Sequence, residues 1–194
     1  MRDIINLLEQ KSKPQDIEII KRNFTDSEVS PVMSKDTIDL HYGKLAHGYA
    51  ERYNAGEGDP DFNFAGAFLH NTLFTQYREV RNNNKPNGPV LSFIKKHFKS
   101  YENFKDEFLK EVMAMQGSGW VYLAYDGKIK TIKNHEVRDD ILLLIDRWEH
   151  AWILDYGTDK EKYLNEQWKI INWNVISTRW GKSLWELKSS AYQK

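Results

Sequence analysis

The chain has 194 residues, a length that fits one domain or two small domains that share a core. Its 28 Lys and Arg balance 28 Asp and Glu, so no overall field attracts a polyanion and nucleic acid is not an expected partner. The absence of Cys excludes disulfides, thiolate zinc sites, iron–sulfur clusters and a Cys nucleophile, so any metal must be bound by His, Asp or Glu.

The start of the chain is expected to be neither a membrane anchor nor a secretory signal. No apolar run approaches the roughly 20 residues that span a bilayer, and Met1–Gln10 contains charged residues in place of an apolar stretch. These features predict a soluble, cytoplasmic protein with no membrane partner. Two short amphipathic helices are expected next, one over Ile4–Leu8 and the other over Ile17–Ile20, after Pro14.

Two long helices are then predicted. Ser34 is the expected N-cap of the first, over Lys35–Tyr53, where apolar residues recur at near-helical spacing. The turn-forming residues Asn54–Pro60 end it, and the second helix is expected over Phe62–Val80. Arg81–Pro89, rich in Asn, Pro and Gly, is the clearest linker in the chain.

The second half of the chain is predicted to combine a small sheet with helices. The turn Asp126-Gly127 separates two alternating segments, Trp120–Tyr125 and Lys128–Lys133, which predicts a β-hairpin. The unbroken apolar run Ile141–Ile145 has the length of a strand and suits the buried middle of the sheet. The helices expected in this half cover Val90–Phe98, Phe104–Met115 and Thr158–Ser189.

The strongest local signal for chemistry is Asp146-Arg-Trp-Glu-His150, directly after the apolar run. A carboxylate and an imidazole four residues apart can bind one metal ion across a single turn, although on spacing alone an ordinary strand-to-helix junction with Asp146 as a cap is the commoner explanation. His41 and His70 lie on the apolar sides of the two long helices, where a lone His is usually a core residue. Together the four side chains supply three imidazoles and one carboxylate, which suits manganese or iron with an open site.

These residues belong to an ordered set that resembles the iron/manganese superoxide dismutase family. The match runs from about Pro31 to Trp180, and its most specific part is the signature Asp146-x-Trp148-Glu149-His150-Ala151. The other matching segments are, in chain order, Met33–Lys44 with His41, Phe62-Asn63 with Gly66 and Leu69-His70, Gly117–Trp120, and Tyr163 with Asn172-Trp173.

The resemblance implies a superoxide dismutase, which converts superoxide to dioxygen and hydrogen peroxide, with one Mn or Fe ion per subunit. His41, His70, Asp146 and His150 would bind the ion, with water or hydroxide as the fifth ligand. Three neutral imidazoles and one carboxylate leave a positive charge at the metal, which attracts a small anion.

Two further side chains are implied to act in catalysis. Tyr49 stands where the family has its gateway Tyr, about two turns past His41, and would gate substrate and relay protons; the alternative is a half-buried Tyr. Gly66 stands where iron-type members have Gln, so the donor to the coordinated solvent is expected from His135, as in some members; the alternative is an exposed loop His. Aromatic residues implied to exclude water, or simply to pack the core, are Trp120, Trp148 and Phe74.

The resemblance also implies the fold, which is α+β. Residues 1–30 form a divergent N-terminal extension that lacks the family's Leu-Pro-rich start. Residues 31–88 form a helical hairpin domain, with a shorter connection between its long helices than the family usually has. Residues 89–194 form an α+β domain with a small three-stranded antiparallel sheet and flanking helices.

Glu149 implies a homodimer, because in the family this residue hydrogen-bonds the last ligand His of the partner subunit. Leu45 and Ile153 stand where the family has a His and a Tyr that meet across the dimer interface at the mouth of the substrate funnel. The two aliphatic side chains preserve packing but remove a polar proton-relay pair, which favours slower turnover without loss of metal. Lys160 replaces an interface Arg.

Three hypotheses therefore stand. The first is an active superoxide dismutase. Gly66, together with a solvent donor that comes later in the chain at His135, favours Mn but does not decide between Mn and Fe. The second is a structural or assembly protein that keeps the fold with weak or no dismutase activity, motivated by the shortened hairpin, the replaced relay pair and the unfamiliar N-terminus. The third is another non-haem iron enzyme with two His and a carboxylate, which the additional His makes less favourable.

Overall fold

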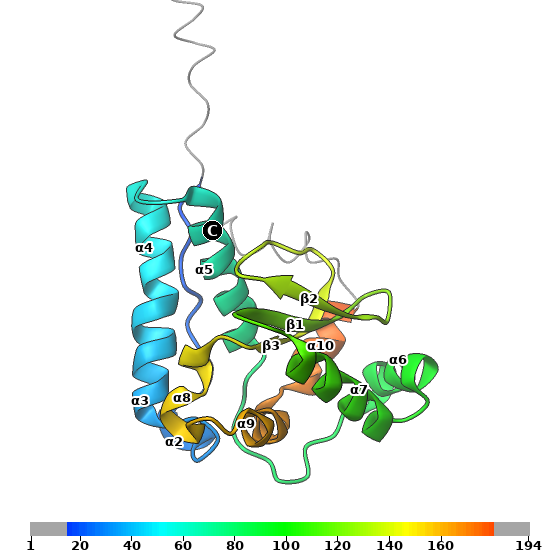
Figure 1. Cartoon of the computed structure of the whole chain (residues 1–194). Coiled ribbons are helices and arrows are strands. Elements are labelled where there is room, and N and C mark those ends of the chain that lie inside the picture. Colours follow the sequence, from blue (N-terminus) through cyan, green and yellow to red (C-terminus); the bar gives the residue numbers. More distant parts are fainter. Residues whose placement is uncertain (1–14, 181–194) are drawn as a thin grey trace, which may run out of the picture.

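The computed structural model describes residues 15–180, so the helix expected over Ile4–Leu8 lies outside the described residues. Figure 1 shows two parts: a pair of long helices side by side, and next to them a small sheet with the remaining helices around it. This is the predicted α+β fold, with a helical hairpin followed by a three-stranded antiparallel sheet. The division into residues 1–30, 31–88 and 89–194 stays a prediction.

The first long helix is continuous from Lys35 to Ala55 but is not α-helical throughout. Ser34 caps its start by accepting a hydrogen bond from the backbone N–H of Thr37. Its middle is a π-helix, which closes its turns with one additional residue. The three consecutive parts are α3 (Lys35–Ile38), η1 (Asp39–Ala46) and α4 (His47–Ala55).

The second long helix, α5 (Pro60–Thr75), follows α4 after a short turn. Gly56 ends α4 in the left-handed conformation, and Asp59 caps α5 through the backbone N–H of Phe62. The prediction that this helix continues to Val80 was wrong. The chain leaves the helix at Gln76 because the segment after it pairs with a distant strand-like stretch: Tyr77 forms a β-bridge with Ile171.

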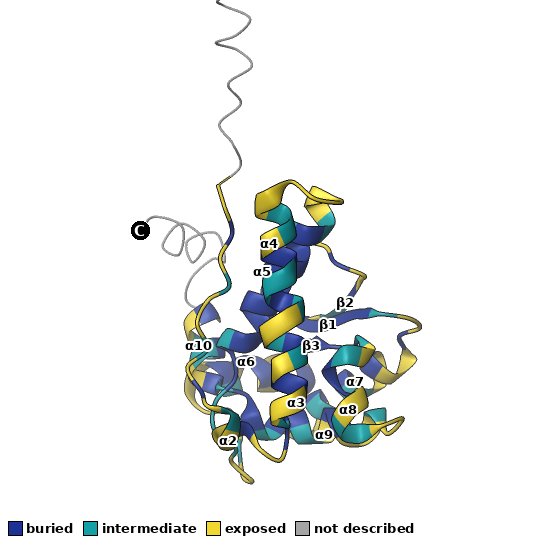
Figure 2. Ribbon diagram, turned by 90° about the vertical axis from the view of Figure 1, so that its left-hand side faces the viewer, coloured by how far each residue is buried: buried dark blue, intermediate teal, exposed yellow. Residues whose placement is uncertain are grey.

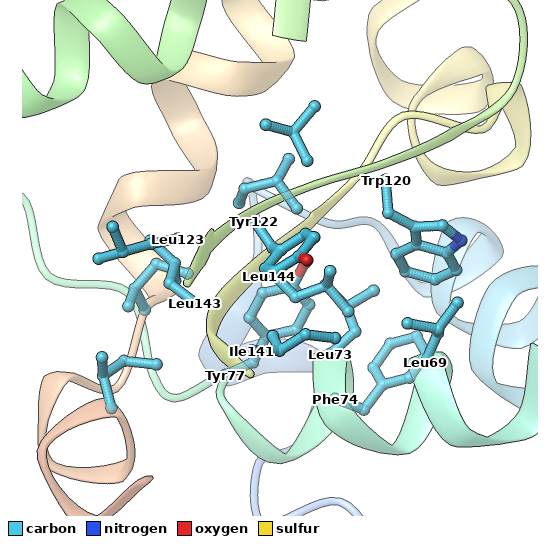
Figure 3. Packing of buried hydrophobic residues seen from close by; sticks show 14 of the residues in the cluster. Leu69, Leu73, Phe74, Tyr77, Trp120, Tyr122, Leu123, Ile141, Leu143 and Leu144 are labelled. Atoms are coloured by element: carbon cyan, nitrogen blue, oxygen red, sulfur yellow. The ribbon is translucent and has the colours of Figure 1, made fainter. Parts of the chain in front are cut away.

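The sheet contains β1 (Gly119–Ala124), β2 (Ile129–Lys133) and β3 (Ile141–Asp146), and both pairings are antiparallel. Their order is β2-β1-β3, so the middle strand is β1 and the prediction that Ile141–Ile145 lies in the middle was wrong. That run is nevertheless buried along its whole length. Figure 3 shows why: Leu69 and Leu73 of α5 pack against one face of the sheet, close to Leu144.

Helices before and after the hairpin complete the fold, and α7 and α10 pack against the sheet. The segment predicted as one helix over Thr158–Ser189 is broken into three helical pieces, because Ile171 extends to form the bridge with Tyr77, and the residues after Trp180 lie outside the described part. The elements are α2 (Asp26–Val29), α6 (Gly88–Phe98), α7 (Tyr101–Ala114), η2 (Glu149–Ala151), α8 (Ile153–Tyr156), α9 (Lys160–Gln167), η3 (Trp168–Ile170) and α10 (Trp173–Trp180).

Residues 15–24, which we call the strap, run in an extended conformation along α4 and α5, so the helix predicted over Ile17–Ile20 was wrong. Two Asn side chains replace the missing helical hydrogen bonds. Asn54 accepts from Ile17 N at 2.9 Å and donates to Ile17 O at 3.0 Å, and Asn71 bonds Ile20 N and Glu18 O, both at 2.8 Å. β-Branched residues favour this extended backbone.

One cluster of buried hydrophobic residues extends from the strap to α10 and joins the hairpin to the sheet. Figure 2 shows β1 and β3 buried behind the hairpin, while the tip of the hairpin is exposed. Within residues 15–180, no helix combines the length and apolar character that crossing a membrane requires.

Candidate metal centre

Four elements from distant parts of the chain each direct one side chain to the same point. His41 comes from the π-helix η1 and His70 from the middle of α5, while Asp146 ends β3 and His150 lies in η2. One nitrogen or oxygen atom from each side chain lies within 4.8 Å of every other. The structure therefore brings together all four residues that the sequence selected.

The cluster lies inside the protein. His41, His70 and Asp146 are 1%, 0% and 0% exposed, and the His150 side chain is 13% exposed. Burial lowers the pKa of His41 and His70, so both imidazoles stay neutral and keep a lone pair for binding. Burial alone would raise the pKa of Asp146, but the attraction of His150 and His41 outweighs it and holds the pKa of this carboxyl well below its usual range.

The four inward-facing atoms have no hydrogen-bond partner. Asp146 Oδ2 lies 3.0 Å from His41 Nε2 and 3.3 Å from His150 Nε2, yet these three atoms and His70 Nε2 are all buried without a correctly oriented hydrogen bond. Leaving buried polar atoms unpaired costs about 1–3 kcal/mol each. A metal cation at their centre satisfies all four, so these residues fit the iron or manganese ion that the resemblance implies.

Neighbouring hydrogen bonds orient two of the four side chains. His70 Nδ1 donates to the carbonyl of Gly66 at 2.7 Å, which directs its Nε2 lone pair inward. Asp146 uses Oδ1 to accept from the backbone N–H of Trp148 at 2.7 Å and leaves Oδ2 for the cluster. The carboxylate thus has both roles considered from the sequence, as a turn cap and as a member of the cluster.

Aromatic rings enclose the cluster. The His41 ring lies against Phe74 with 4.9 Å between centroids, and Trp120 meets His70 edge-on at 5.1 Å. Trp148 is stacked on His135 with centroids 4.6 Å apart. These rings leave little room for solvent around the four atoms, which lowers the local dielectric.

His135 is buried and connects two other aromatic residues, which contradicts the exposed loop His considered from the sequence. Trp120 Nε1, which can only donate, lies 3.1 Å from His135 Nδ1, so Nδ1 must accept. Burial lowers the pKa of His135 to about 4, and the neutral ring then carries its proton on Nε2. That proton is donated to the Tyr49 hydroxyl at 2.9 Å, so the single N–H of the neutral ring goes to Tyr49 and not, as expected from the sequence, to coordinated solvent. The hydroxyl hydrogen of Tyr49 is left free for another acceptor.

Gly66 allows Tyr49 to reach this position. A Cβ atom at residue 66 would lie only 2.7 Å from Cγ and Cδ1 of the Tyr49 ring. The absence of a side chain therefore has a steric reason that is independent of metal choice. Phe62, which lies in a segment that matches the family but was given no role at the site from the sequence, packs its ring 4.7 Å from His135 between centroids.

Comparison with known proteins supports one family. The profile of the iron/manganese superoxide dismutase C-terminal domain matches residues 86–179. A Bacteroides fragilis protein named superoxide dismutase (Fe) is 36% identical over 84% of this chain and 98% of its own length. The chain belongs to the iron/manganese superoxide dismutase family.

Other relatives of this superoxide dismutase chain carry names with either metal. A Porphyromonas gingivalis protein named superoxide dismutase (Mn/Fe) is 32% identical over 84% of this chain and 98% of its own length. A mitochondrial superoxide dismutase (Mn) of Onchocerca volvulus is 30% identical over 80% of this chain and 82% of its own length. These names alone do not choose between iron and manganese for this chain.

Two residues that differ from the family pattern, Leu45 and Ile153, lie near the family-like Glu149 at the surface. Glu149 is exposed in η2, and the neighbouring α8 exposes Ile153 and Leu154, which are 41% and 54% accessible. Leu45 is half-buried in η1, whose residues contact η2. An apolar surface thus adjoins the element that carries His150.

Proposed function

We propose that this chain converts superoxide to dioxygen and hydrogen peroxide at one iron or manganese ion per subunit, bound by His41, His70, Asp146 and His150. The observation that carries the proposal is the convergence of four buried atoms that lack hydrogen-bond partners. The bound ion supplies one-electron oxidation and reduction, which disproportionation of superoxide requires. The family membership of the chain supports the same activity.

The chain's own groups supply the proton handling. Forming hydrogen peroxide consumes two protons for every two superoxide ions. The Tyr49 hydroxyl accepts from His135 Nε2 and keeps its own hydrogen free, so this pair can deliver a proton and be reprotonated from the surface side. Trp120 holds the His135 tautomer that makes this direction possible. Trp148, stacked on His135, excludes water beside this pair, and Phe74 does so beside His41.

The homodimer belongs to the same proposal. The exposed surface of Glu149, Ile153 and Leu154 suits contact with a second copy, since exposed apolar patches beside a polar group mark interaction sites. In such a dimer, Glu149 would bond the partner's last ligand His. A cytoplasmic location stays a prediction from the sequence.

Metal analysis of protein purified without a tag, followed by superoxide consumption per metal ion, tests the function. The proposal expects about one iron or manganese per chain and activity proportional to that metal; sedimentation of the same sample measures the dimer. Protein that binds the metal but consumes no superoxide would support the structural or assembly alternative. That alternative is motivated by the short α4–α5 turn and by Leu45 and Ile153.

The change His135→Gln tests the role of the buried imidazole. A Gln carbonyl can accept from Trp120 and its amide can donate to Tyr49, so we expect metal content to stay near the wild-type value. Because the amide replaces the ring that positions the Tyr49 hydroxyl, and Tyr49 lies against His70, the turnover and the reduction potential are expected to change through Tyr49. About 1.4 kcal/mol of altered stabilisation changes an equilibrium tenfold. Potentiometry and stopped-flow decay of superoxide measure both. Unchanged potential and rate would contradict the assignment.

A further inference from the structure

The outer edge of β3 is buried but has no neighbouring strand within residues 15–180. β3 pairs with β1 on one side only, and its alternate residues Leu142, Leu144 and Asp146 direct backbone groups to the other side. In most proteins such buried groups are paired with backbone of another strand. Here three side chains from three different helical regions take that place.

These side chains, which we call the edge clamp, are Gln76, Tyr163 and Arg179. Arg179 Nη1 donates to Leu142 O at 2.9 Å. Gln76 pairs with Leu144 twice, because its carbonyl accepts from Leu144 N at 3.1 Å and its amide donates to Leu144 O. Tyr163 donates its hydroxyl to the carbonyl of Asp146 at 3.0 Å. The last bond holds the backbone of a proposed metal ligand.

Arg179 also joins the clamp to the end of α5. It is only 4% exposed, and no ion pair among the described residues includes it. It donates to Gln76 Oε1 at 3.0 Å, to the Thr72 carbonyl at 2.6 Å and to Thr75 Oγ1 at 3.1 Å. The Thr72 carbonyl is one of the last four of α5, so a guanidinium suits this helix end.

Two ligand-bearing elements are therefore fixed to each other by these hydrogen bonds. The last turn of α5 follows directly after His70, and β3 ends at Asp146. Leu69 and Leu73 contribute apolar packing between the same elements (Figure 3), but packing alone tolerates small sliding movements. Directional hydrogen bonds resist such sliding movements, because they weaken steeply when misaligned.

We propose that the edge clamp is a positioning device that fixes Asp146 relative to His70 and so sets how tightly and in what geometry the metal is bound. This rests on the proposed function only in taking the metal as iron or manganese. None of the three side chains touches the cluster of four ligand atoms, so their action is through the backbone of β3. Outer hydrogen bonds of this kind typically change metal affinity by about 10–100-fold.

The cleanest test is Tyr163→Phe, which removes one hydroxyl from a buried ring and preserves its shape. The matched control is Tyr101→Phe, because the Tyr101 hydroxyl is also buried but has no hydrogen-bond partner among the described residues. We expect iron-loaded Tyr163→Phe to release metal to a chelator about tenfold faster or more and to show an altered electron paramagnetic resonance spectrum. Tyr101→Phe should match the wild type in both measurements.

A second pair of variants separates the loss of the clamp from a loss of overall stability. Gln76→Met deletes both bonds to Leu144, and Ile94→Ala lowers stability by about 2–5 kcal/mol from a buried site on α6. Faster release and a changed spectrum only in Gln76→Met support the clamp. If Gln76→Met and Ile94→Ala have equal melting temperatures, release metal at equal rates and keep the wild-type spectrum, the proposal is overturned. A wild-type protein that binds no iron or manganese would instead refute the proposed function.

If Gln76→Met does not fold, Arg179→Lys provides the same measurement. Lys keeps the positive charge but cannot reach the spread of acceptors that the planar guanidinium reaches. We expect faster metal release and an altered spectrum here too. Wild-type values in Tyr163→Phe and Arg179→Lys together would contradict the proposal.

Discussion

Replacing His41 by alanine is expected to abolish metal binding and superoxide consumption together. The change removes one of the four proposed ligand atoms and leaves the Asp146 carboxylate, which is fully buried, with one fewer neighbour. Loss of a group that only orients a ligand already costs about 10–100-fold in metal affinity, so loss of the ligand itself should exceed this. Metal content by elemental analysis and activity per chain measure the effect.

Asn71→Ala is the control for this experiment, because Asn71 adjoins the proposed ligand His70 but directs its amide to the strap. Its loss breaks bonds to Ile20 N and Glu18 O and is expected to lower stability by about 1–3 kcal/mol. Metal content should stay at the wild-type value. A His41→Ala protein that retains metal, or an Asn71→Ala protein that folds but loses it, would contradict the assignment of ligands.

The second large effect is expected from Gly66→Ala. The new Cβ would lie 2.7 Å from the Tyr49 ring, which cannot move aside freely because His135 and Phe62 pack against it. We expect a loss of stability of about 1–3 kcal/mol from this overpacking. The Tyr49–His135 hydrogen bond should break, and turnover should fall roughly 100-fold, the lower end of what a positioned proton donor contributes.

Gly43→Ala is the matched control, a helix glycine on the element that carries His41. A Cβ atom added at Gly43 would have the carbonyl oxygen of Ile38 as its nearest neighbour, at 3.9 Å. It should be neutral or stabilise the fold by up to about 1 kcal/mol, because Ala favours helix over Gly. Thermal unfolding and superoxide decay rates compare the two variants. Equal turnover in Gly66→Ala and Gly43→Ala would show that the Tyr49 position does not matter for the reaction.

Periodicity predicted most of the fold, because amphipathic patterns report local structure. It identified the long helical hairpin, the β-hairpin around Asp126-Gly127 and the buried run that became β3. It failed where a partner distant in the chain decides the local structure, as the Tyr77–Ile171 bridge does after α5. The strap around Ile17 is extended only because Asn54 and Asn71 supply its hydrogen bonds, and no local pattern encodes partners so distant in the chain.

The residues of the candidate site could also be predicted in large part from the sequence. Spacing alone favoured an ordinary junction at Asp146 and core positions for His41 and His70. The four taken together and the family resemblance pointed to residues that the structure places within 4.8 Å of one another. Their binding of a metal stays a proposal. The direction of the proton between His135 and Tyr49 could not be read from the sequence, since it depends on the indole donor of Trp120.

The depth of the four ligand atoms has a consequence for how the metal is acquired. Copper and zinc outcompete manganese and iron at nitrogen and oxygen sites at equilibrium. In this fold, however, three of the four proposed ligand side chains are 0–1% exposed. We therefore expect an ion that binds during folding to exchange only slowly afterwards. The metal found in the isolated protein should then reflect the supply of ions during synthesis more than their relative affinities for the site.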